Sequence, residues 1–222
     1  MISGGTGTGK TTFLNALSAV IPENERIITI EDVAELSLQH ENWVRLESAH
    51  GPGLKEISIR DCLINALRMR PDRILVGECR RDETFEMLQA MNTGHEGSMT
   101  TVHANGSRDC LTRLESLVLS SNVDIPIPAL RKQIASAIDL IVQLKRDKTG
   151  LRYVQEIVEI TGMEQSTVTT QAIFQRAKKA TGPEGLMAAG LVPSFIERFG
   201  EAGVQLPPNF FDPNTAITYR PD

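Results

Sequence analysis

Long apolar runs, a basic surplus and paired cysteines are all missing from this chain of 222 residues. No apolar run approaches the roughly 18 residues of a membrane-spanning helix, so we expect no membrane span of its own. The 28 acidic and 23 basic residues give a net charge of −5, which argues against a protein that binds nucleic acid mainly through electrostatics. The three cysteines are odd in number and widely spaced, which fits neither a disulfide framework nor a zinc site. We expect reduced thiols and a cytosolic protein.

What the chain does contain is a phosphate-binding motif close to its start. Residues 4–11 read G-G-T-G-T-G-K-T and match G-x-x-x-x-G-K-[ST] in full. In such a loop the backbone N–H groups point at phosphate oxygens, Lys10 reaches the β- and γ-phosphates, and Thr11 ligates magnesium. The alternative is a glycine- and threonine-rich turn before a helix. The residues expected to contact ATP, with Mg²⁺ on Thr11, are Gly4, Gly5, Thr6, Gly7, Thr8, Gly9, Lys10, Thr11 and Thr12.

Apolar runs alternate with helical periodicity through the first part of the chain. The runs that predict strands lie at residues 26–32, 73–78 and 97–103, with a weaker candidate at 42–48. Helical spacing lies between them, and an S-x-x-D box at Ser58 and Asp61 predicts a capped helix. This alternation predicts an α/β fold with a mainly parallel sheet.

The pattern changes towards the end of the chain. A turn at residues 147–150 between two apolar runs predicts an antiparallel hairpin, and 166–175 predicts a further strand. We therefore expect a P-loop nucleotide-binding domain over residues 1–162. A C-terminal extension, made of a strand and an irregular segment, is expected over 163–222.

Polar side chains follow three of the predicted strands where each strand ends. They are Glu31 with Asp32, then Glu78, then His103. In open parallel sheets the ligand lies at the carboxyl ends of the strands, so we expect these side chains to face one crevice beside the phosphate loop.

Each of these residues has a chemical role and a structural alternative. Glu78 suits a carboxylate that holds Mg²⁺ directly or through water, or it is an ordinary acid at a helix N-terminus. Glu31 is expected to polarise the attacking water, with Asp32 as the alternative base or as a cap of the next turn. His103 is expected to donate to the γ-phosphate, or it is a structural histidine bonded to backbone.

Five arginines flank the second strand, and they have two interpretations. A solvated or ion-paired face is the usual one. In an oligomer, one of them would reach a neighbour's phosphate as an arginine finger. The five are Arg68, Arg70, Arg73, Arg80 and Arg81.

Four segments occur in the order that is typical of one family. They are GGTGTGKTT, ITIEDVAEL, LRMRPDRILVGECR and TGHEGSMTTVHAN. The chain resembles the type II/IV secretion traffic ATPases, and within them the ATPase of the tight-adherence (Tad, Flp-type) pilus. The segments are similar to that family's Walker A loop, Asp box, Walker B segment and His box. Gly77 stands where other P-loop classes carry aspartate, and a glycine at this position of the Walker B segment is typical of this family.

The resemblance implies a RecA-like P-loop NTPase that forms a homo-hexamer. It implies a cytoplasmic motor, peripheral at the inner face of the bacterial inner membrane, which hydrolyses ATP with Mg²⁺ and powers pilus assembly or protein secretion. The implied partner is an inner-membrane platform protein. It also implies catalysis by Glu31, the Walker B role for Glu78 and γ-phosphate sensing by His103.

The family carries an N-terminal domain before its motor domain, and only three residues precede the phosphate loop here. We therefore expect a motor domain whose first strand is cut short. Two other functions stay open. One is a truncated nucleotide-binding fragment with little or no activity that acts only as an assembly module. The other is a P-loop kinase for a small molecule, which gives no reason for the His103 segment.

Overall fold

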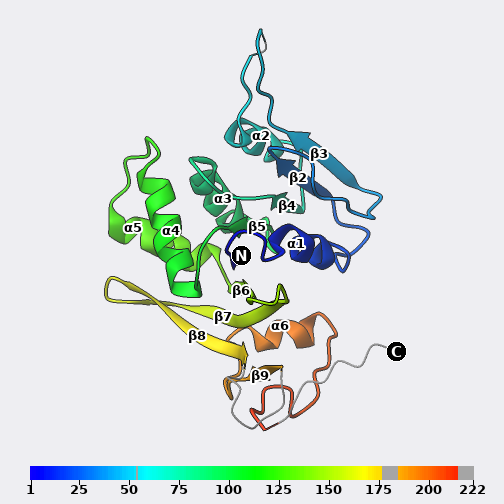
Figure 1. Cartoon of the computed structure of the whole chain (residues 1–222), viewed down its shortest axis with the longest axis vertical. Coiled ribbons are helices and arrows are strands. Elements are labelled where there is room, and N and C mark those ends of the chain that lie inside the picture. Colours follow the sequence, from blue (N-terminus) through cyan, green and yellow to red (C-terminus); the bar gives the residue numbers. More distant parts are fainter. Residues whose placement is uncertain (54, 177–184, 215–222) are drawn as a thin grey trace.

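One sheet runs through the computed structural model, which describes residues 1–53, 55–176 and 185–214. Within these residues it has nine strands in the order β3-β2-β4-β5-β1-β6-β7-β8-β9 (Figure 1). The strands are β1 (Ile2–Gly4), β2 (Ile27–Glu31), β3 (Trp43–Glu47), β4 (Arg73–Val76), β5 (Met99–Val102), β6 (Leu140–Arg146), β7 (Arg152–Glu164), β8 (Thr167–Arg176) and β9 (Leu186–Ala188).

The first six strands of this order are parallel, and the last three are antiparallel. Strand β1 lies between β5 and β6, with Ile2 opposite Thr101 and Val142. Because β2, β4, β5 and β1 run the same way, their carboxyl ends meet at one edge of the sheet. The mainly parallel α/β sheet with an antiparallel extension, predicted from the sequence, is confirmed.

The central strands bury both of their faces. On β2, Ile28 and Ile30 belong to one hydrophobic core, while Ile27 belongs to the core on the opposite face with Leu75 of β4. A strand buried on both sides favours apolar residues at most positions, which explains the nearly continuous apolar runs in the sequence.

The helices divide unequally between these two faces. Leu14 of α1 packs into the core that holds Ile27, whereas α2, α3, α4 and α5 contribute to the other core. Figure 1 shows α1 on the opposite side of the strands from α3, α4 and α5. The helices are α1 (Lys10–Ser18), α2 (Ile59–Ala66), α3 (Glu83–Asn92), α4 (Ser107–Leu119), α5 (Ile127–Ala137) and α6 (Ile196–Glu201).

Local sequence signals set several of these helix boundaries. The box at the start of α2 is complete: Ser58 accepts from the Asp61 N–H, and the Asp61 carboxylate accepts from the Ser58 N–H. The helix before β6, α5, begins at Ile127 with Pro128 in its first turn. Proline fits there because the first-turn N–H groups have no partner within a helix.

The C-terminal segment packs on the antiparallel part of the sheet. The Glu159 carboxylate of β7 is buried and accepts from Gln171 Nε2 at 2.7 Å and from the Ser194 N–H at 2.8 Å. Phe174 of β8 also packs against Phe210 and Phe211, with ring centroids 5.7 and 5.8 Å away. These contacts fasten the segment before and after α6 to the sheet.

Sequence patterns described this end of the chain least well. They missed β9, whose three residues are too few to show a period. Residue 162, our expected domain boundary, lies inside β7. Part of the irregular segment that we expected covers 177–184 and 215–222, outside the described residues. No helix in the described part of the chain is long and apolar enough to cross a membrane.

Candidate functional site

The phosphate loop connects β1 to α1. Gly7 and Gly9 take φ angles of +71° and +90°, a left-handed region that favours glycine, and this lets the chain turn sharply into the helix. Inside the loop, Thr8 Oγ1 donates to the Gly5 carbonyl at 2.9 Å. The first N–H groups of α1 have no partner within the helix and carry its positive end. The loop therefore presents the N–H groups at the start of α1 where the sequence predicted phosphate.

Lys10 lies back over this loop. Its Nζ donates to the carbonyls of Gly4 and Gly5 at 3.1 and 3.3 Å. Burial lowers the pKa of Lys10, and the nearby Glu78 carboxylate opposes that shift. The ammonium is thus partly desolvated and held by neutral carbonyls, an arrangement that an anion in the loop would improve.

Glu31, the last residue of β2, is a buried carboxylate; one of its oxygens is held by two N–H groups, and the other has no partner in the described residues. Its side chain is only 3% exposed. Oε1 accepts from the N–H groups of Glu35 and Leu36 at 3.1 and 2.9 Å. Oε2 is buried and has no hydrogen-bond partner within the described residues. An unpartnered buried carboxylate oxygen is costly, so it is expected where a proton or a ligand is to be accepted.

Glu78 follows β4, the strand beside β2. Its Oε2 accepts from Arg80 Nη2 at 2.7 Å, and its side chain is 20% exposed. A cleft of about 490 Å³ is lined by Glu78 together with Glu31 and Thr11. The predicted magnesium residues, Thr11 and Glu78, therefore face the same space as the predicted catalytic carboxylate. Oxygen ligands of this kind, in a cleft that Glu31 also lines, fit Mg²⁺.

A second cleft, of about 670 Å³, opens on the other side of the phosphate loop. Nothing in the sequence predicted this cleft. Gln143 of β6 lines it and is 1% exposed, with its Oε1 lacking a partner within the described residues. The β6–β7 hairpin adds Arg146, opposite Arg152 in the strand register. The cleft residues are Gly5, Thr6, Thr8, Asn105, Gln143, Leu144, Lys145, Arg146, Asp147, Lys148, Thr149 and Gly150.

Both hairpin arginines lie close to the loop glycines. A Cβ atom on Gly7 would lie 3.5 Å from Arg146 Nη1, and one on Gly9 would lie 3.3 Å from Arg152 Cδ. The basic residues of the run LKRDKTGLR around the turn could have indicated an anion-binding segment. Nothing in this run, however, predicts that the hairpin folds back over the phosphate loop.

A family model for type II/IV secretion system proteins matches residues 1–184. The chain belongs to this family. The resemblance drawn from four sequence segments is therefore confirmed at the level of the secretion ATPase family, while the tight-adherence branch within it stays a prediction.

Several members of the secretion family are similar over part of their length. A putative conjugal transfer protein of Mycobacterium tuberculosis is 40% identical over 175 residues, 78% of this chain and 48% of that protein. The type IV secretion system protein VirB11 of Bartonella quintana is 45% identical over 149 residues, 66% of this chain and 42% of that protein. The chain thus spans about half the length of the curated relatives it matches.

A solved secretion-family structure has the same fold. The crystal structure of the VirB11 ATPase from the Brucella suis type IV secretion system, in complex with sulphate, superposes with a TM-score of 0.64 and 34% identity. The match covers 70% of this chain and 46% of that one. This likeness confirms the predicted P-loop ATPase fold.

Two predicted site residues, His103 and Thr12, are not held by polar contacts of their side chains within the described residues. His103 follows β5 and is exposed; no hydrogen bond or ion pair involves its ring within the described residues. Since β5 lies between β4 and β1, His103 is at the same sheet edge as Glu78 and the phosphate loop. Thr12 is exposed on α1, and no polar contact of its side chain occurs among the described residues.

The arginines near β4 divide into paired and free ones. Arg73 forms an ion pair with Glu25, and Arg80 forms one with Glu78. These two arginines therefore fit the interpretation of an ion-paired face. Arg81 is exposed and makes no side-chain ion pair with a described residue. Asp32, the alternative base, lines the same cleft as Glu31, and its carboxylate contacts Ser48 and His50.

Proposed function

We propose that this chain binds ATP with Mg²⁺ and hydrolyses it, as the motor part of a secretion or pilus machine. The observation that carries the proposal is the state of Glu31. Its carboxylate is buried beside the phosphate loop, one oxygen is fixed by two N–H groups, and the other has no partner in the described residues. A carboxylate held in this way is suited to accept a proton from an attacking water.

The other residues of the cleft would bind and orient the phosphates. Lys10 would exchange two carbonyl contacts for phosphate oxygens, and the first N–H groups of α1 would donate to the same group. Thr11 and Glu78 would hold Mg²⁺, which supplies charge neutralisation of the phosphates when bound. Glu31 would hold the water and take its proton. His103 would donate to the γ-phosphate from the end of β5.

The second cleft would receive the rest of the nucleotide. Its polar lining includes Gln143 and Asn105, and the hairpin places Arg146 and Arg152 over the loop. Two arginines opposite one another repel, and no ion pair offsets this within the described residues. A bound polyphosphate would relieve that repulsion.

The assembled state is proposed from the relatives. They are described as type IV secretion and conjugal transfer proteins. By that likeness we propose a homo-hexamer at the inner face of the inner membrane, working with a membrane platform protein. Arg81, exposed and free of ion pairs in the described part of the chain, is the candidate to reach a neighbour's phosphate. Pilus assembly of the tight-adherence type is the most specific form of this proposal.

The two alternatives make different predictions. An inactive assembly module would bind nucleotide without turnover. A small-molecule kinase would need an acceptor pocket, and membership of the secretion family argues against it. The test is phosphate release from ATP by the chain with and without Mg²⁺, beside Lys10→Ala. We expect slow, magnesium-dependent release that Lys10→Ala abolishes. Binding without release would favour the assembly module.

A further inference from the structure

Two chain segments lie beyond β3, the edge strand of the parallel sheet. They are the arms at residues 48–50 and 56–58, joined as an antiparallel bridge by Ala49 and Ile57 with N–O distances of 2.9 and 3.0 Å. Figure 1 shows this hairpin projecting past the end of the sheet, between β3 and α2. Nothing in the phosphate chemistry proposed above uses it. Its two arms nevertheless line the cleft of about 490 Å³ through His50 and Glu56.

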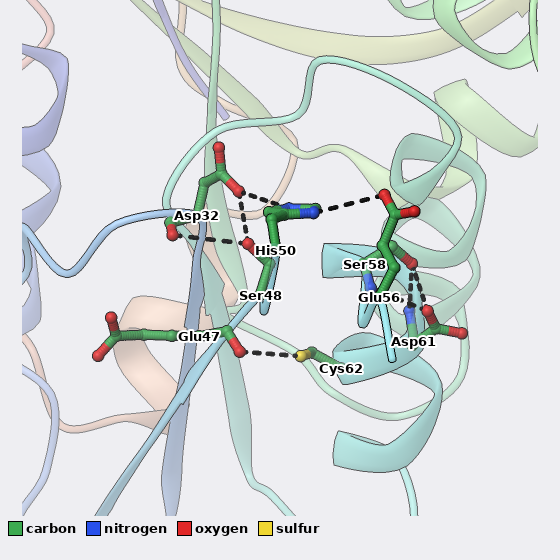
Figure 2. Close-up of polar contacts among 8 residues, drawn as sticks. All are labelled: Asp32, Glu47, Ser48, His50, Glu56, Ser58, Asp61 and Cys62. Carbon is green, nitrogen blue, oxygen red and sulfur yellow. Dashed lines mark hydrogen bonds and ion pairs between the residues drawn. The ribbon is translucent and has the colours of Figure 1, made fainter. Parts of the chain in front are cut away.

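His50 connects the two arms to Asp32. Its Nε2 lies 3.3 Å from Asp32 Oδ1, and its Nδ1 lies 3.4 Å from Glu56 Oε1 (Figure 2). Ser48 Oγ also donates to Asp32 Oδ1, at 2.5 Å. The hydrogen bond from Ser48, and after it the contact with His50, lowers the pKa of Asp32, so this carboxylate is ionised at neutral pH. Asp32 is therefore held by the hairpin rather than by the phosphate loop.

Asp32 in turn begins the short turn that fixes Glu31. Residues 32–36 carry the two N–H groups, of Glu35 and Leu36, that donate to Glu31 Oε1. The far end of this turn is also anchored on β3, because Arg45 Nη2 donates to the Leu36 carbonyl. Contacts from β3 and its hairpin thus hold both ends of the segment that orients the Glu31 carboxylate.

We propose that His50 is a positioning residue for Glu31. By clamping Asp32 to the hairpin, the imidazole keeps the turn at residues 32–36 in the geometry in which the Glu35 and Leu36 N–H groups hold the Glu31 carboxylate. Within the described residues, His50 itself makes no polar contact with the phosphate loop or with Glu31, so its effect passes through Asp32. The part of this proposal that concerns hydrolysis rests on the proposed function; the part that concerns the turn does not.

The first test needs no nucleotide. Hydrogen exchange at the Glu35 and Leu36 amides would be measured by NMR in the wild type, His50→Ala, His50→Gln and the control His95→Ala. His95 contacts the Ala90 carbonyl, away from this turn. We expect exchange about three- to tenfold faster in His50→Ala, because local opening becomes easier, and no change in the control. His50→Gln keeps one N–H donor for Asp32 and should recover most of the protection. Unchanged exchange in His50→Ala would overturn the proposal.

The second test separates positioning from simple stability. With ATP and Mg²⁺, His50→Ala should lower kcat about three- to tenfold and leave KM within about twofold, since only the orientation of the base changes. In an Asp32→Ala background His50→Ala should have no further effect, because both changes break the same link. Faster amide exchange with an unchanged kcat would also overturn the proposal. If no variant, the wild type included, hydrolyses ATP, the proposed function fails and the exchange data alone decide the role of His50.

Discussion

Gly77 of the β4 end lies directly against Glu31 of β2: a Cβ atom on Gly77 would stand 3.1 Å from Glu31 Cγ. This contact gives a physical reason for the glycine in the segment ILVGE, where other P-loop classes carry aspartate. The absent side chain leaves the space that the buried Glu31 carboxylate occupies. Because β2 and β4 are neighbouring parallel strands, the residues at their carboxyl ends pack against each other.

Gly77→Ala should therefore disturb Glu31. A contact of 3.1 Å is tighter than most real Cβ contacts, so the Glu31 side chain must shift. We expect ATP turnover to fall by about tenfold or more, since misplacing a catalytic group weakens its effect steeply. Gly200→Ala is the control, because a Cβ there meets nothing within 4 Å. Steady-state phosphate release measures both, and equal rates in the two variants would refute the packing argument.

Lys10→Ala should weaken nucleotide binding without lowering the stability of the free chain. Burial lowers the pKa of Lys10, which means that the folded state disfavours its charged form at neutral pH. Its removal should leave the melting temperature of the free chain unchanged or higher. The rise in melting temperature on adding ATP with Mg²⁺ should disappear. Lys132→Ala, an exposed lysine on α5, is the matched control and should keep that rise.

The buried thiols should resist alkylation in the folded chain. Burial raises the pKa of Cys79 to about 12 and that of Cys110 to about 11, so almost no thiolate is present at pH 8. Iodoacetamide at pH 8 should modify neither cysteine until the chain unfolds. Intact-mass spectrometry with and without guanidinium checks this, and rapid labelling of both residues in buffer alone would contradict the structure.

The Asp32–Ser48 contact should show a defined pH dependence. The folded-state pKa of Asp32 is lowered, so the contact stabilises the fold above the unfolded value of about 3.9 and is lost as pH falls through the folded value. The unfolding free energies of wild type and Ser48→Ala should differ by a small, constant amount above about pH 5. That difference should shrink below pH 4. A difference that grows on acidification would reverse the assigned sign.

Local patterns in the sequence predicted the parts of the site that depend on neighbours along the chain. The phosphate loop needs only its glycines and Lys10, and the α2 cap needs only Ser58 and Asp61. Glu31 and Glu78 were found because each lies at the carboxyl end of a buried strand. Their shared position at one sheet edge followed from parallel pairing, a general property of alternating strands and helices.

Contacts between distant segments were not predictable in this way. The β6–β7 hairpin turn was expected, but its return over the phosphate loop, with Arg146 near Gly7, depends on β6 pairing with β1. The link from His50 to Asp32 likewise depends on β3 lying beside β2. Periodicity within one segment carries no information on which strand becomes its neighbour.

The most direct test of the account compares Glu31→Gln with Asp32→Asn and the wild type. Phosphate release gives turnover and calorimetry gives ATP affinity. Glutamine keeps the size of Glu31 and can still accept the Glu35 and Leu36 N–H groups, but it cannot take a proton. We expect Glu31→Gln to bind ATP as the wild type does and to lose turnover by on the order of 10²–10⁴-fold, while Asp32→Asn loses about tenfold or less. Abolished turnover in Asp32→Asn with near-normal turnover in Glu31→Gln would contradict the assignment of the catalytic base.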